Sequence, residues 1–261
     1  MKICQDKNKK ANIMKKFLVI AALFPIAFAT TFNIKIPTPS KTLPYSEDIN
    51  LGGGSETQPY QYTGDTCEDD GAITSETVNI LNSWSGYNYS SDNWCNQVSL
   101  NMNNNNLTIV PEEIGSLTNL TSLNLYNNQL TTVPESIGNL TSLTHLYLYN
   151  NQLTTVPESI GNLTSLTYLH LRYNQLTTVP DGIGNLTNLT YLYLHNNQLS
   201  TVPNSIGNLT SLTHLYLYNN QLSTVPNTIN NLNNLDYLYL NDNPGSPFPN
   251  IDCSGIVNCN K

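Results

Sequence analysis

From residue 97 onward the chain repeats itself every 23 residues, and this period constrains the fold more than any other feature. One full unit, residues 143–165, reads LTHLYLYNNQLTTVPESIGNLTS. Two marker residues recur at this spacing without a slip. The first is an asparagine, at Asn105, Asn128, Asn151, Asn174, Asn197, Asn220 and Asn243, and the second is a proline, at Pro111, Pro134, Pro157, Pro180, Pro203, Pro226 and Pro249. A period of this length is typical of stacked repeats, in which each unit contacts only its neighbours.

The period also accounts for an unusual composition. The chain of 261 residues contains 41 asparagines, and charged residues make up 11% of it, against roughly 25% in a typical soluble domain. A chain rich in asparagine can be disordered, but a repeat in constant register excludes that interpretation here. Ten lysines and arginines are too few for a basic nucleic-acid-binding stripe, so we expect no nucleic-acid partner.

The first part of each unit matches the pattern L-x-x-L-x-L-x-x-N-x-L, and on this pattern the chain resembles the leucine-rich repeat family. The segment V-P-x-x-I-G-N-L is similar to the 23-residue Ras-suppressor-like class, and I-G-N-L-T is similar to plant receptor ectodomains. The resemblance covers residues 97–249. It implies an α/β fold, a right-handed leucine-rich repeat solenoid with a parallel β-sheet on the concave face and short helical or 3₁₀ turns on the convex face.

The side chains of the unit support this fold independently. Seven apolar residues can point toward a core that only stacked units close, namely Leu143, Leu146, Leu148, Leu153, Val156, Ile160 and Leu163. We expect the marker asparagines to satisfy backbone groups buried in the turn after each strand and to form a structural ladder. We expect Pro134 and its equivalents to fix φ at the start of the convex turn, and Gly138 and its equivalents to end that turn.

The N-terminal region indicates export. Met14-Lys15-Lys16 precedes the apolar run FLVIAALFPIAFA, which ends at Ala29. Residues 1–29 are therefore predicted to be a signal peptide cleaved after Ala29, with Met14 as a candidate true start. The run is short for a membrane span, and a retained N-terminal anchor is the alternative. Cleavage would leave a strongly acidic chain, which is predicted to be secreted or to lie at the cell surface.

Residues 30–66 contain four prolines and the run Gly52-Gly53-Gly54 without hydrophobic periodicity. This composition predicts a flexible linker, and a short functional peptide within it is the alternative.

Four cysteines remain after cleavage, and an even number in an exported chain points to disulfide bonds. Cys67 and Cys95 lie before the repeats, whereas Cys253 and Cys259 follow them. Four cysteines allow three pairings, and local pairing is favoured because the whole repeat array separates the two sets. A zinc site is the alternative, and the lack of a histidine near either pair argues against it.

A stack of repeats exposes its core at both ends unless it is capped. Residues 67–96 are the predicted N-terminal cap, in which an acidic run at Glu68 to Asp70 predicts a helix start. Ile73, Thr77, Ile80 and Leu81 follow at helical spacing. A helix, a tryptophan and a paired cysteine before the first repeat resemble the N-terminal caps of plant-type extracellular leucine-rich repeats. Seven repeats are predicted over 97–249, and residues 250–261 are the predicted C-terminal cap.

Three positions around L-x-L in each unit face the concave side of the expected sheet. All four histidines of the chain, its arginine and ten of its 16 tyrosines lie in these three columns. Repeats 120–142 and 143–165 differ only at Ser122/His145 and Asn124/Tyr147, and both positions are concave. We therefore predict a binding surface made of His145, Tyr147, Tyr149, Tyr168, His170, Arg172, Tyr191, Tyr193, His195, His214, Tyr216, Tyr218, Tyr237 and Tyr239.

A protein or peptide partner fits this surface, because tyrosine combines a large rigid area with a hydroxyl group. A glycan is the alternative ligand. A third interpretation is a structural extracellular spacer, in which exposed strand positions simply tolerate tyrosine. Arg172 could hold a carboxylate or lie against a tyrosine ring.

Two further interpretations concern the histidines. Histidine titrates near neutral pH, which predicts a pH-sensitive patch. His145, His170 and His195 lie on a diagonal across adjacent strands that could admit a two-histidine metal site, but no acidic residue on the same columns completes it. We therefore expect no metal.

No H-E-x-x-H motif, glycine-rich phosphate loop or supported catalytic triad occurs in the sequence. We expect a non-catalytic protein without a cofactor. Eight N-x-S/T sequons occur, and several of them are part of the G-N-L-T sequence that recurs in the repeat. In a eukaryotic secretory pathway some of them would carry glycans.

Overall fold

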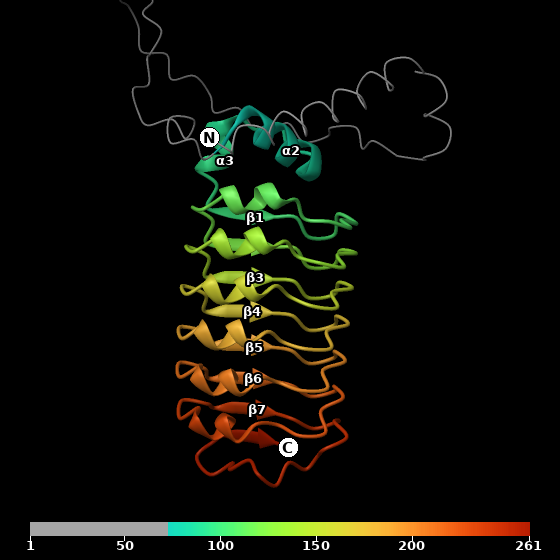
Figure 1. Ribbon diagram of the computed structural model, residues 1–261, viewed down its shortest axis with the longest axis vertical. Helices are drawn as coiled ribbons and strands as arrows, with labels where there is room; N and C mark the ends of the chain where they lie inside the picture. Colours follow the sequence, from blue (N-terminus) through green and yellow to red (C-terminus); the bar gives the residue numbers. More distant parts are fainter. Residues whose placement is uncertain (1–72) are drawn as a thin grey trace, which may run out of the picture. The chain divides into compact units, whose positions relative to one another are not determined.

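The computed structural model describes residues 73–261 of the chain. These residues form a stack of repeats around one parallel eight-stranded sheet, whose strands follow chain order (Figure 1). Neighbouring strands pair in register, so that Ser99 lies opposite Ser122 and His214 lies opposite Tyr237. The predicted solenoid with a parallel sheet is therefore confirmed. The strands are β1 (Ser99–Asn101), β2 (Ser122–Asn124), β3 (His145–Tyr147), β4 (Tyr168–His170), β5 (Tyr191–Tyr193), β6 (His214–Tyr216), β7 (Tyr237–Tyr239) and β8 (Asn258–Asn260).

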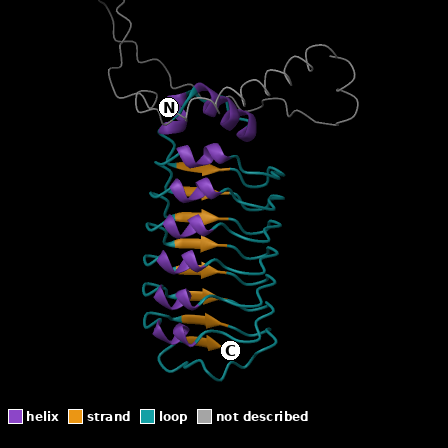
Figure 2. Cartoon of the chain, in the orientation of Figure 1, coloured by secondary structure: helices purple, strands orange, loops and turns teal. Residues whose placement is uncertain are grey.

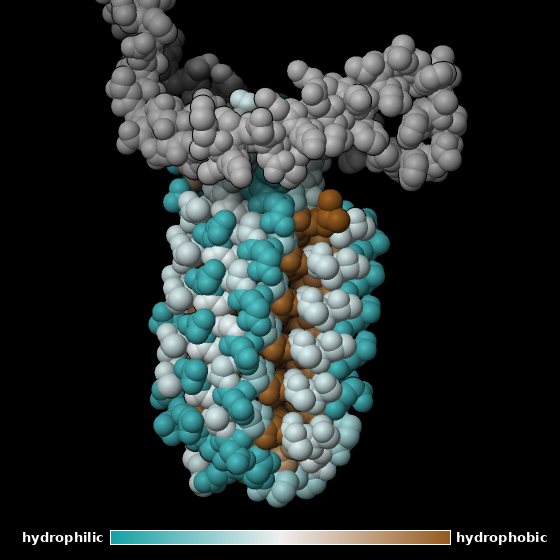
Figure 3. Space-filling model, in the orientation of Figure 1, coloured by the Kyte–Doolittle hydropathy of each residue, from teal (hydrophilic) through white to brown (hydrophobic). Residues whose placement is uncertain are grey.

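Each strand is short because only the L-x-L segment of a unit alternates between outward and inward side chains. In β3, Leu146 is fully buried, while His145 and Tyr147 on either side remain partly exposed. The buried leucines, valines and isoleucines of successive units form one continuous core. The valines that precede the proline marker keep 6–8% of their surface exposed, and an apolar stripe runs along the stack of repeats in Figure 3.

Short 3₁₀ helices form a second column that runs along the stack, parallel to the column of strands (Figure 2). Pro134 stands immediately before one of them with φ −69° and ψ 154°, so the proline marker does fix the backbone at the helix start. The helices within residues 73–261 are η1 (Glu112–Ser116), η2 (Glu135–Asn139), η3 (Glu158–Asn162), η4 (Asp181–Asn185), η5 (Asn204–Asn208) and η6 (Asn227–Asn231).

The predicted role of the glycine in this segment is wrong. Gly138 lies inside η2, and the helix continues to Asn139 with Leu140 as the residue that follows it. A Cβ atom on Gly138 would lie 2.5 Å from the backbone oxygen of Ser159 in the next unit. The glycine is therefore needed for the close approach of neighbouring 3₁₀ helices and does not terminate its own helix.

The marker asparagines form the expected ladder, and their partners are backbone groups of two consecutive units. Asn151 donates through Nδ2 to the carbonyl oxygen of Leu148 in its own unit (3.1 Å) and to that of Leu125 in the preceding unit (3.0 Å). Its Oδ1 accepts from the backbone N–H of Leu130 at 3.0 Å. The same arrangement recurs at Asn174, Asn197, Asn220 and Asn243, all of them buried. Each asparagine therefore ties its own turn to the turn before it.

Asn105 departs from the predicted ladder. Its side chain is exposed and makes none of the bonds described for Asn151; instead, its backbone N–H donates to Oδ1 of Asn128 at 3.0 Å. The reason is its place in the first unit, where the N-terminal cap and not another repeat precedes it. The sequence marker is thus the same at Asn105 as elsewhere, but its structural role is absent.

A second column of amides, which the sequence pattern does not predict, lies one residue before the ladder. The turn at this position is left-handed, with φ of 54° at both Asn127 and Asn150, a conformation that asparagine tolerates better than most residues. Asn127 donates to Oδ1 of Asn104 at 3.0 Å, and Asn150 donates to Oδ1 of Asn127 at 2.6 Å. This column explains why two consecutive asparagines recur in most units.

The N-terminal cap contains two helices, α2 (Ser75–Ser85) and α3 (Ser91–Cys95). The α2 helix begins after Thr74, whose side chain accepts from the backbone N–H of Thr77, so the predicted helix starts later than the acidic run suggests. Ile73 is buried but precedes the helix. Trp84 joins the cap to the first repeat, because its indole N–H donates to the carbonyl oxygen of Ile109 at 2.9 Å.

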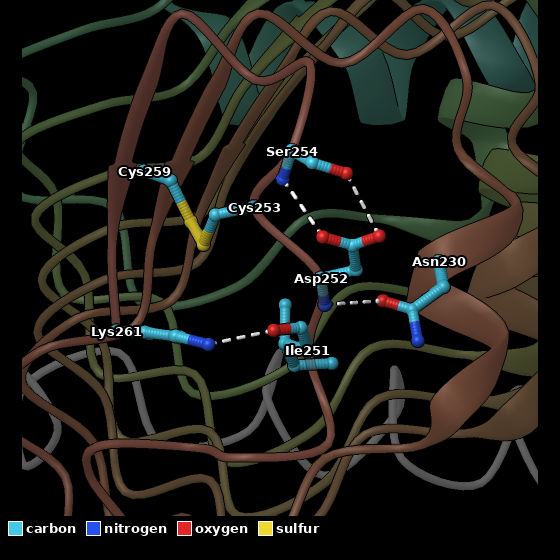
Figure 4. The surroundings of a disulfide bond; sticks show 7 residues. All are labelled: Asn230, Ile251, Asp252, Cys253, Ser254, Cys259 and Lys261. Atoms are coloured by element: carbon cyan, nitrogen blue, oxygen red, sulfur yellow. Dashed lines mark hydrogen bonds between the residues drawn. A yellow bond between two sulfur atoms is a disulfide. The ribbon is translucent and has the colours of Figure 1, made fainter.

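The C-terminal cap adds a strand that the sequence pattern does not predict. The β8 strand pairs with β7 in parallel and places Cys259 opposite Leu238 of the core. Cys253 and Cys259 form a disulfide bond, which is the local pairing favoured at this end (Figure 4). Phe248 and Ile251 are buried against the last repeat.

One departure from the repeat is explained by this cap. Asn230 stands where the preceding units have the glycine of the 3₁₀ helix. Its Oδ1 accepts from the backbone N–H of Asp252 at 3.0 Å, and its Nδ2 donates to the carbonyl oxygen of Asn250 at 3.0 Å (Figure 4 shows the first contact). No further 3₁₀ helix stacks on this position within the described residues, so a side chain fits and closes the end.

The predicted signal peptide at 1–29 and linker at 30–66 lie outside the described residues, as do Cys67 and the acidic run at Glu68 to Asp70. Cys95 is disulfide-bonded, and its pairing with Cys67 stays a prediction.

The ladder generates a stability prediction with an internal control. Asn151→Ala should lower the free energy of unfolding by about 2–4 kcal/mol, because a buried backbone N–H loses its acceptor and two carbonyls each lose a donor. Asn105→Ala should change it by less than about 0.5 kcal/mol, as expected of a surface substitution. Equilibrium urea denaturation of both variants checks this. Equal destabilisation by the two substitutions would contradict the assigned role of the ladder.

Candidate binding surface on the concave face

The structure brings the predicted binding residues together on the outward face of the parallel sheet, which we call the concave face. The first and second columns lie within strands β3 to β7, on either side of the buried central leucine. The third column follows each strand after the next buried leucine. The first column is His145, Tyr168, Tyr191, His214 and Tyr237, the second is Tyr147, His170, Tyr193, Tyr216 and Tyr239, and the third is Tyr149, Arg172, His195 and Tyr218.

Rings in the same column stack on one another from repeat to repeat. In the second column the ring centroids of His170 and Tyr193 lie 4.6 Å apart, and those of Tyr193 and Tyr216 lie 4.8 Å apart. In the first column His214 lies 4.4 Å from both Tyr191 and Tyr237. These distances follow from the register, because paired strands lie ~4.8 Å apart and present equivalent positions to each other.

This stacking determines which part of each ring a ligand can reach. The planes of Tyr193 and Tyr216 differ by 22°, and those of His214 and Tyr237 by 19°, so these rings lie nearly face to face. In these pairs each ring covers one face of its neighbour in the next repeat, which leaves ring edges and hydroxyls for a ligand. Burial raises the pKa of Tyr147 and Tyr216, and their hydroxyls therefore stay protonated and able to donate.

Two aromatic residues outside the predicted set extend this surface. Tyr126 stacks on Tyr149 with a centroid distance of 4.4 Å, which adds one more repeat to the third column. Its position in the column was visible in the sequence. Tyr173 lies beside the third column and is 50% exposed. In the sequence, Tyr173 could have been noticed because it replaces an asparagine of the repeat.

Arg172 lies between two tyrosine rings. Its guanidinium carbon is 5.0 Å from the ring centroid of Tyr149 and 5.4 Å from that of Tyr173. Both distances are within the range of cation–π attraction. Of the two roles considered for Arg172, contact with aromatic rings is therefore present, and it holds the positive charge in place on the concave face.

Tyr173 has a strained backbone. Its φ is 52°, in the left-handed region that the equivalent residues of other units enter as asparagine or aspartate. For a residue as bulky as tyrosine this conformation costs roughly 1–2 kcal/mol. Tyr173 also interrupts the second column of amides between Asn150 and Asn196. The fourth repeat thus gives up local stability that its neighbours retain.

The two buried histidines of the concave face correct the prediction of a pH-sensitive patch. Burial, with smaller contributions from the charges of Arg172 and His195, lowers the pKa of His170 to about 3. Burial and the charge of Arg172 lower the pKa of His195 to about 4. Burial also lowers the pKa of His214, despite the opposing charge of Asp236. His170 and His195 are therefore neutral near neutral pH, and the predicted patch is wrong for them.

Buried nitrogens without a partner gather in the same place. Among residues 73–261, Nε2 of His170, Nδ1 of His195 and Nε of Arg172 are buried without a hydrogen-bond partner. An unsatisfied buried polar group typically costs about 1–3 kcal/mol. All three atoms belong to the repeats of β4 and β5, so the cost is local to one part of the surface.

Neither a group of three potential metal ligands nor a helix able to cross a membrane occurs among the described residues. No three His, Cys, Asp or Glu side chains within residues 73–261 lie close enough to hold a metal ion, and the diagonal of His145, His170 and His195 is no exception. No helix in this part of the chain is long and apolar enough to cross a membrane.

Comparison with known proteins shows the family. The model of the leucine-rich repeat region matches residues 99–174 and 159–247, more than half of the chain, and the chain therefore belongs to the leucine-rich repeat family. No curated protein matches.

Solved structures similar to this chain include a plant peptide hormone receptor, a TDR receptor and a Leptospira interrogans protein. The plant peptide hormone receptor RGFR1, in complex with RGF2, is 37% identical over 56% of this chain and 24% of that chain, with a TM-score of 0.53. A TDR receptor is 33% identical over 52% of this chain and 24% of that one, with a TM-score of 0.50. The Leptospira interrogans LRR protein LIC12759 is 36% identical over 59% and 46%, with a TM-score of 0.49. This chain thus spans less than half the length of each.

The buried histidines predict how stability depends on pH. Because the unfolded chain binds protons near pH 6.5 and folded His170 and His195 do not, the free energy of unfolding should fall as pH drops below 6.5. Each histidine should contribute up to about 1.4 kcal/mol per pH unit. The double variant His170→Phe/His195→Phe keeps both rings and should flatten this dependence. Denaturation midpoints measured from pH 7 to pH 5 check it, and an unchanged slope in the variant would refute it.

Proposed function

We propose that this chain is a non-catalytic leucine-rich repeat protein that binds a protein or peptide partner across its concave face. The observation that carries the proposal is the set of costly features around β4 and β5. Tyr173 is strained, and buried nitrogens of His170, His195 and Arg172 lack partners. Neighbouring units with the same framework avoid the strain at the position of Tyr173. In a repeat that served only as a spacer, these destabilising features would have no use. In a binding site they are retained because they position groups for recognition.

The similarity to two receptors supports a peptide or protein partner. RGFR1 is described as a peptide hormone receptor in complex with RGF2, and TDR is described as a receptor. Both share the fold of this chain over about half of its length. The aromatic, nearly uncharged concave face provides this chain with the rigid area and hydroxyl groups typical of protein-binding surfaces.

The geometry of the rings favours this partner over a glycan. A sugar would bind tyrosine chiefly by stacking on a ring face, but Tyr193 and Tyr216 lie nearly face to face and cover that side of each other. Ring edges and hydroxyls suit a partner that brings its own backbone amides and side chains. A glycan therefore becomes an outcome that the experiment below can detect.

We also propose that the chain is exported and acts outside the cell. The predicted signal peptide at 1–29 supports export. The disulfide bond between Cys253 and Cys259 is a second support, because such bonds persist in oxidising compartments.

The partner-binding proposal is tested on the central tyrosines. Tyr147→Ser, Tyr168→Ser and Tyr193→Ser combined should weaken binding of a partner captured from the native surroundings by at least about 30-fold, as expected when central aromatic contacts are lost. Titration of the purified partner by calorimetry measures this, and a glycan array run in parallel examines the alternative ligand.

The controls separate binding from folding. The same three tyrosines changed to Phe keep the stacked rings and show how much of the effect comes from the hydroxyls. Gln152→Ala, Gln175→Ala and Gln198→Ala combined alter exposed residues outside the three columns and should leave affinity unchanged. Undiminished binding by the serine variant would mean that the concave face is not the binding surface.

A further inference from the structure

A hollow of about 450 Å³ lies at the C-terminal end of the concave face, where β6, β7 and β8 meet. Its lining differs from the rest of the face, because a carboxylate joins the aromatic rings. The lining residues are Tyr216, Tyr218, Tyr239, Asn241, Asp242 and Asn260. The tyrosine hydroxyls and the amide NH₂ groups of this lining can donate hydrogen bonds. Its other polar atoms are the carboxylate oxygens of Asp242 and the amide oxygens, which can only accept them.

The rings in this hollow form a corner. The planes of Tyr218 and Tyr239 are nearly perpendicular, at 76°, with centroids 6.5 Å apart. Tyr216 lies almost parallel to Tyr239, with centroids 5.0 Å apart and an interplanar angle of 27°. Two perpendicular ring faces can both approach one group placed between them. Edge-to-face pairs also occur elsewhere on the concave face, for example between Tyr193 and His195 at 73°, but the pair of Tyr218 and Tyr239 lines the hollow together with a carboxylate. Such a corner suits a cation, which is attracted to ring faces.

The carboxylate of Asp242 is placed at this corner without a balancing charge. Asp242 accepts one hydrogen bond, from Nδ2 of Asn241 at 2.5 Å. The buried Oδ1 of Asn241 has no hydrogen-bond partner in the described structure. The turn at Asp242 is left-handed, with φ of 56°, and the other units hold an asparagine there except the fourth, which holds Tyr173. The seventh unit thus introduces a negative charge where the repeat framework requires only a small polar side chain.

The two cations within residues 73–261 are engaged elsewhere. Arg172 lies against Tyr149 and Tyr173 at the end of β4, three strands from Asp242. At ~4.8 Å per strand this separation is roughly 14 Å, longer than the screening length of about 8 Å at physiological salt. Lys261 donates through Nζ to the carbonyl oxygen of Ile251 at 2.7 Å (Figure 4).

We propose that this hollow binds a guanidinium group of the partner, an arginine side chain, with Asp242 as the counter-charge and Tyr218 and Tyr239 as the walls. This site rests on the proposed function, because the guanidinium group would belong to the partner proposed above. A guanidinium offers a planar set of donors, which matches a carboxylate and neighbouring amide oxygens better than a single-point ammonium does. Its flat face can lie against a tyrosine ring at the same time.

The test uses a small probe in place of the native partner. N-acetyl-arginine amide is titrated into the whole protein and followed by NMR chemical shifts, and N-acetyl-citrulline amide serves as the neutral probe of equal shape. The arginine probe should bind in the millimolar range and the citrulline probe at least about tenfold more weakly. Asp242→Asn should reduce binding of the arginine probe to the level of citrulline, because the side chain keeps its size and tolerates the left-handed turn.

Two control variants accompany this substitution. Asp181→Asn removes a carboxylate at the start of η4, on the opposite side of the repeat, and should leave probe binding unchanged. Gln152→Ala changes an exposed residue outside the three columns and should also leave probe binding unchanged.

Three results would overturn the proposal. They are equal binding of the arginine and citrulline probes, unchanged binding of the arginine probe to Asp242→Asn, and no binding of the arginine probe up to about 10 mM. Each of them would leave the test of the central tyrosines unaffected, because that test does not use the probe. The failure of this inference can therefore be told apart from the failure of the proposed function.

Discussion

The structure depends on the buried hydrogen bonds by which the marker asparagines from Asn128 to Asn243 join the backbone of two consecutive units. A turn that leaves the sheet every 23 residues buries amide groups that no strand partner reaches. Asn151 and its equivalents satisfy these groups on both sides of each interface between repeats. With the backbone held in this way, leucines lie over leucines, and strands only three residues long can form a continuous sheet.

This framework places the functional chemistry at the outward positions of the sheet. Because the inward positions and turns are fixed by packing and hydrogen bonding, the three concave columns are where units can differ without breaking the stack. The same register brings equivalent side chains within about 5 Å of each other, so a repeated tyrosine becomes a stacked row. Units that depart from the pattern, at Arg172, Tyr173 and Asp242, then stand out as the places where recognition can be specific.

Much of this was predictable from the sequence, and the errors share one cause. The period identified the solenoid, the core positions and the concave columns, because each depends on spacing alone. The roles of Gly138 and Asn105 could not be derived from one unit. Gly138 is required by the 3₁₀ helix of the next unit, and Asn105 lacks a preceding unit to bond. The low pKa values of His170 and His195 likewise follow from burial among neighbouring rings, which no spacing pattern measures.

The sequence by itself determined the family, the number of residues per unit and which side chains face outward, because a strict repeat turns local patterns into positions in space. The tertiary structure alone decided the ends of the stack and the electrostatic character of the surface. It placed β8 on the last strand, set two tyrosine rings at right angles beside Asp242 and held Arg172 between two others. These features depend on contacts between different units and on partial burial, and they exist only when the repeats are stacked.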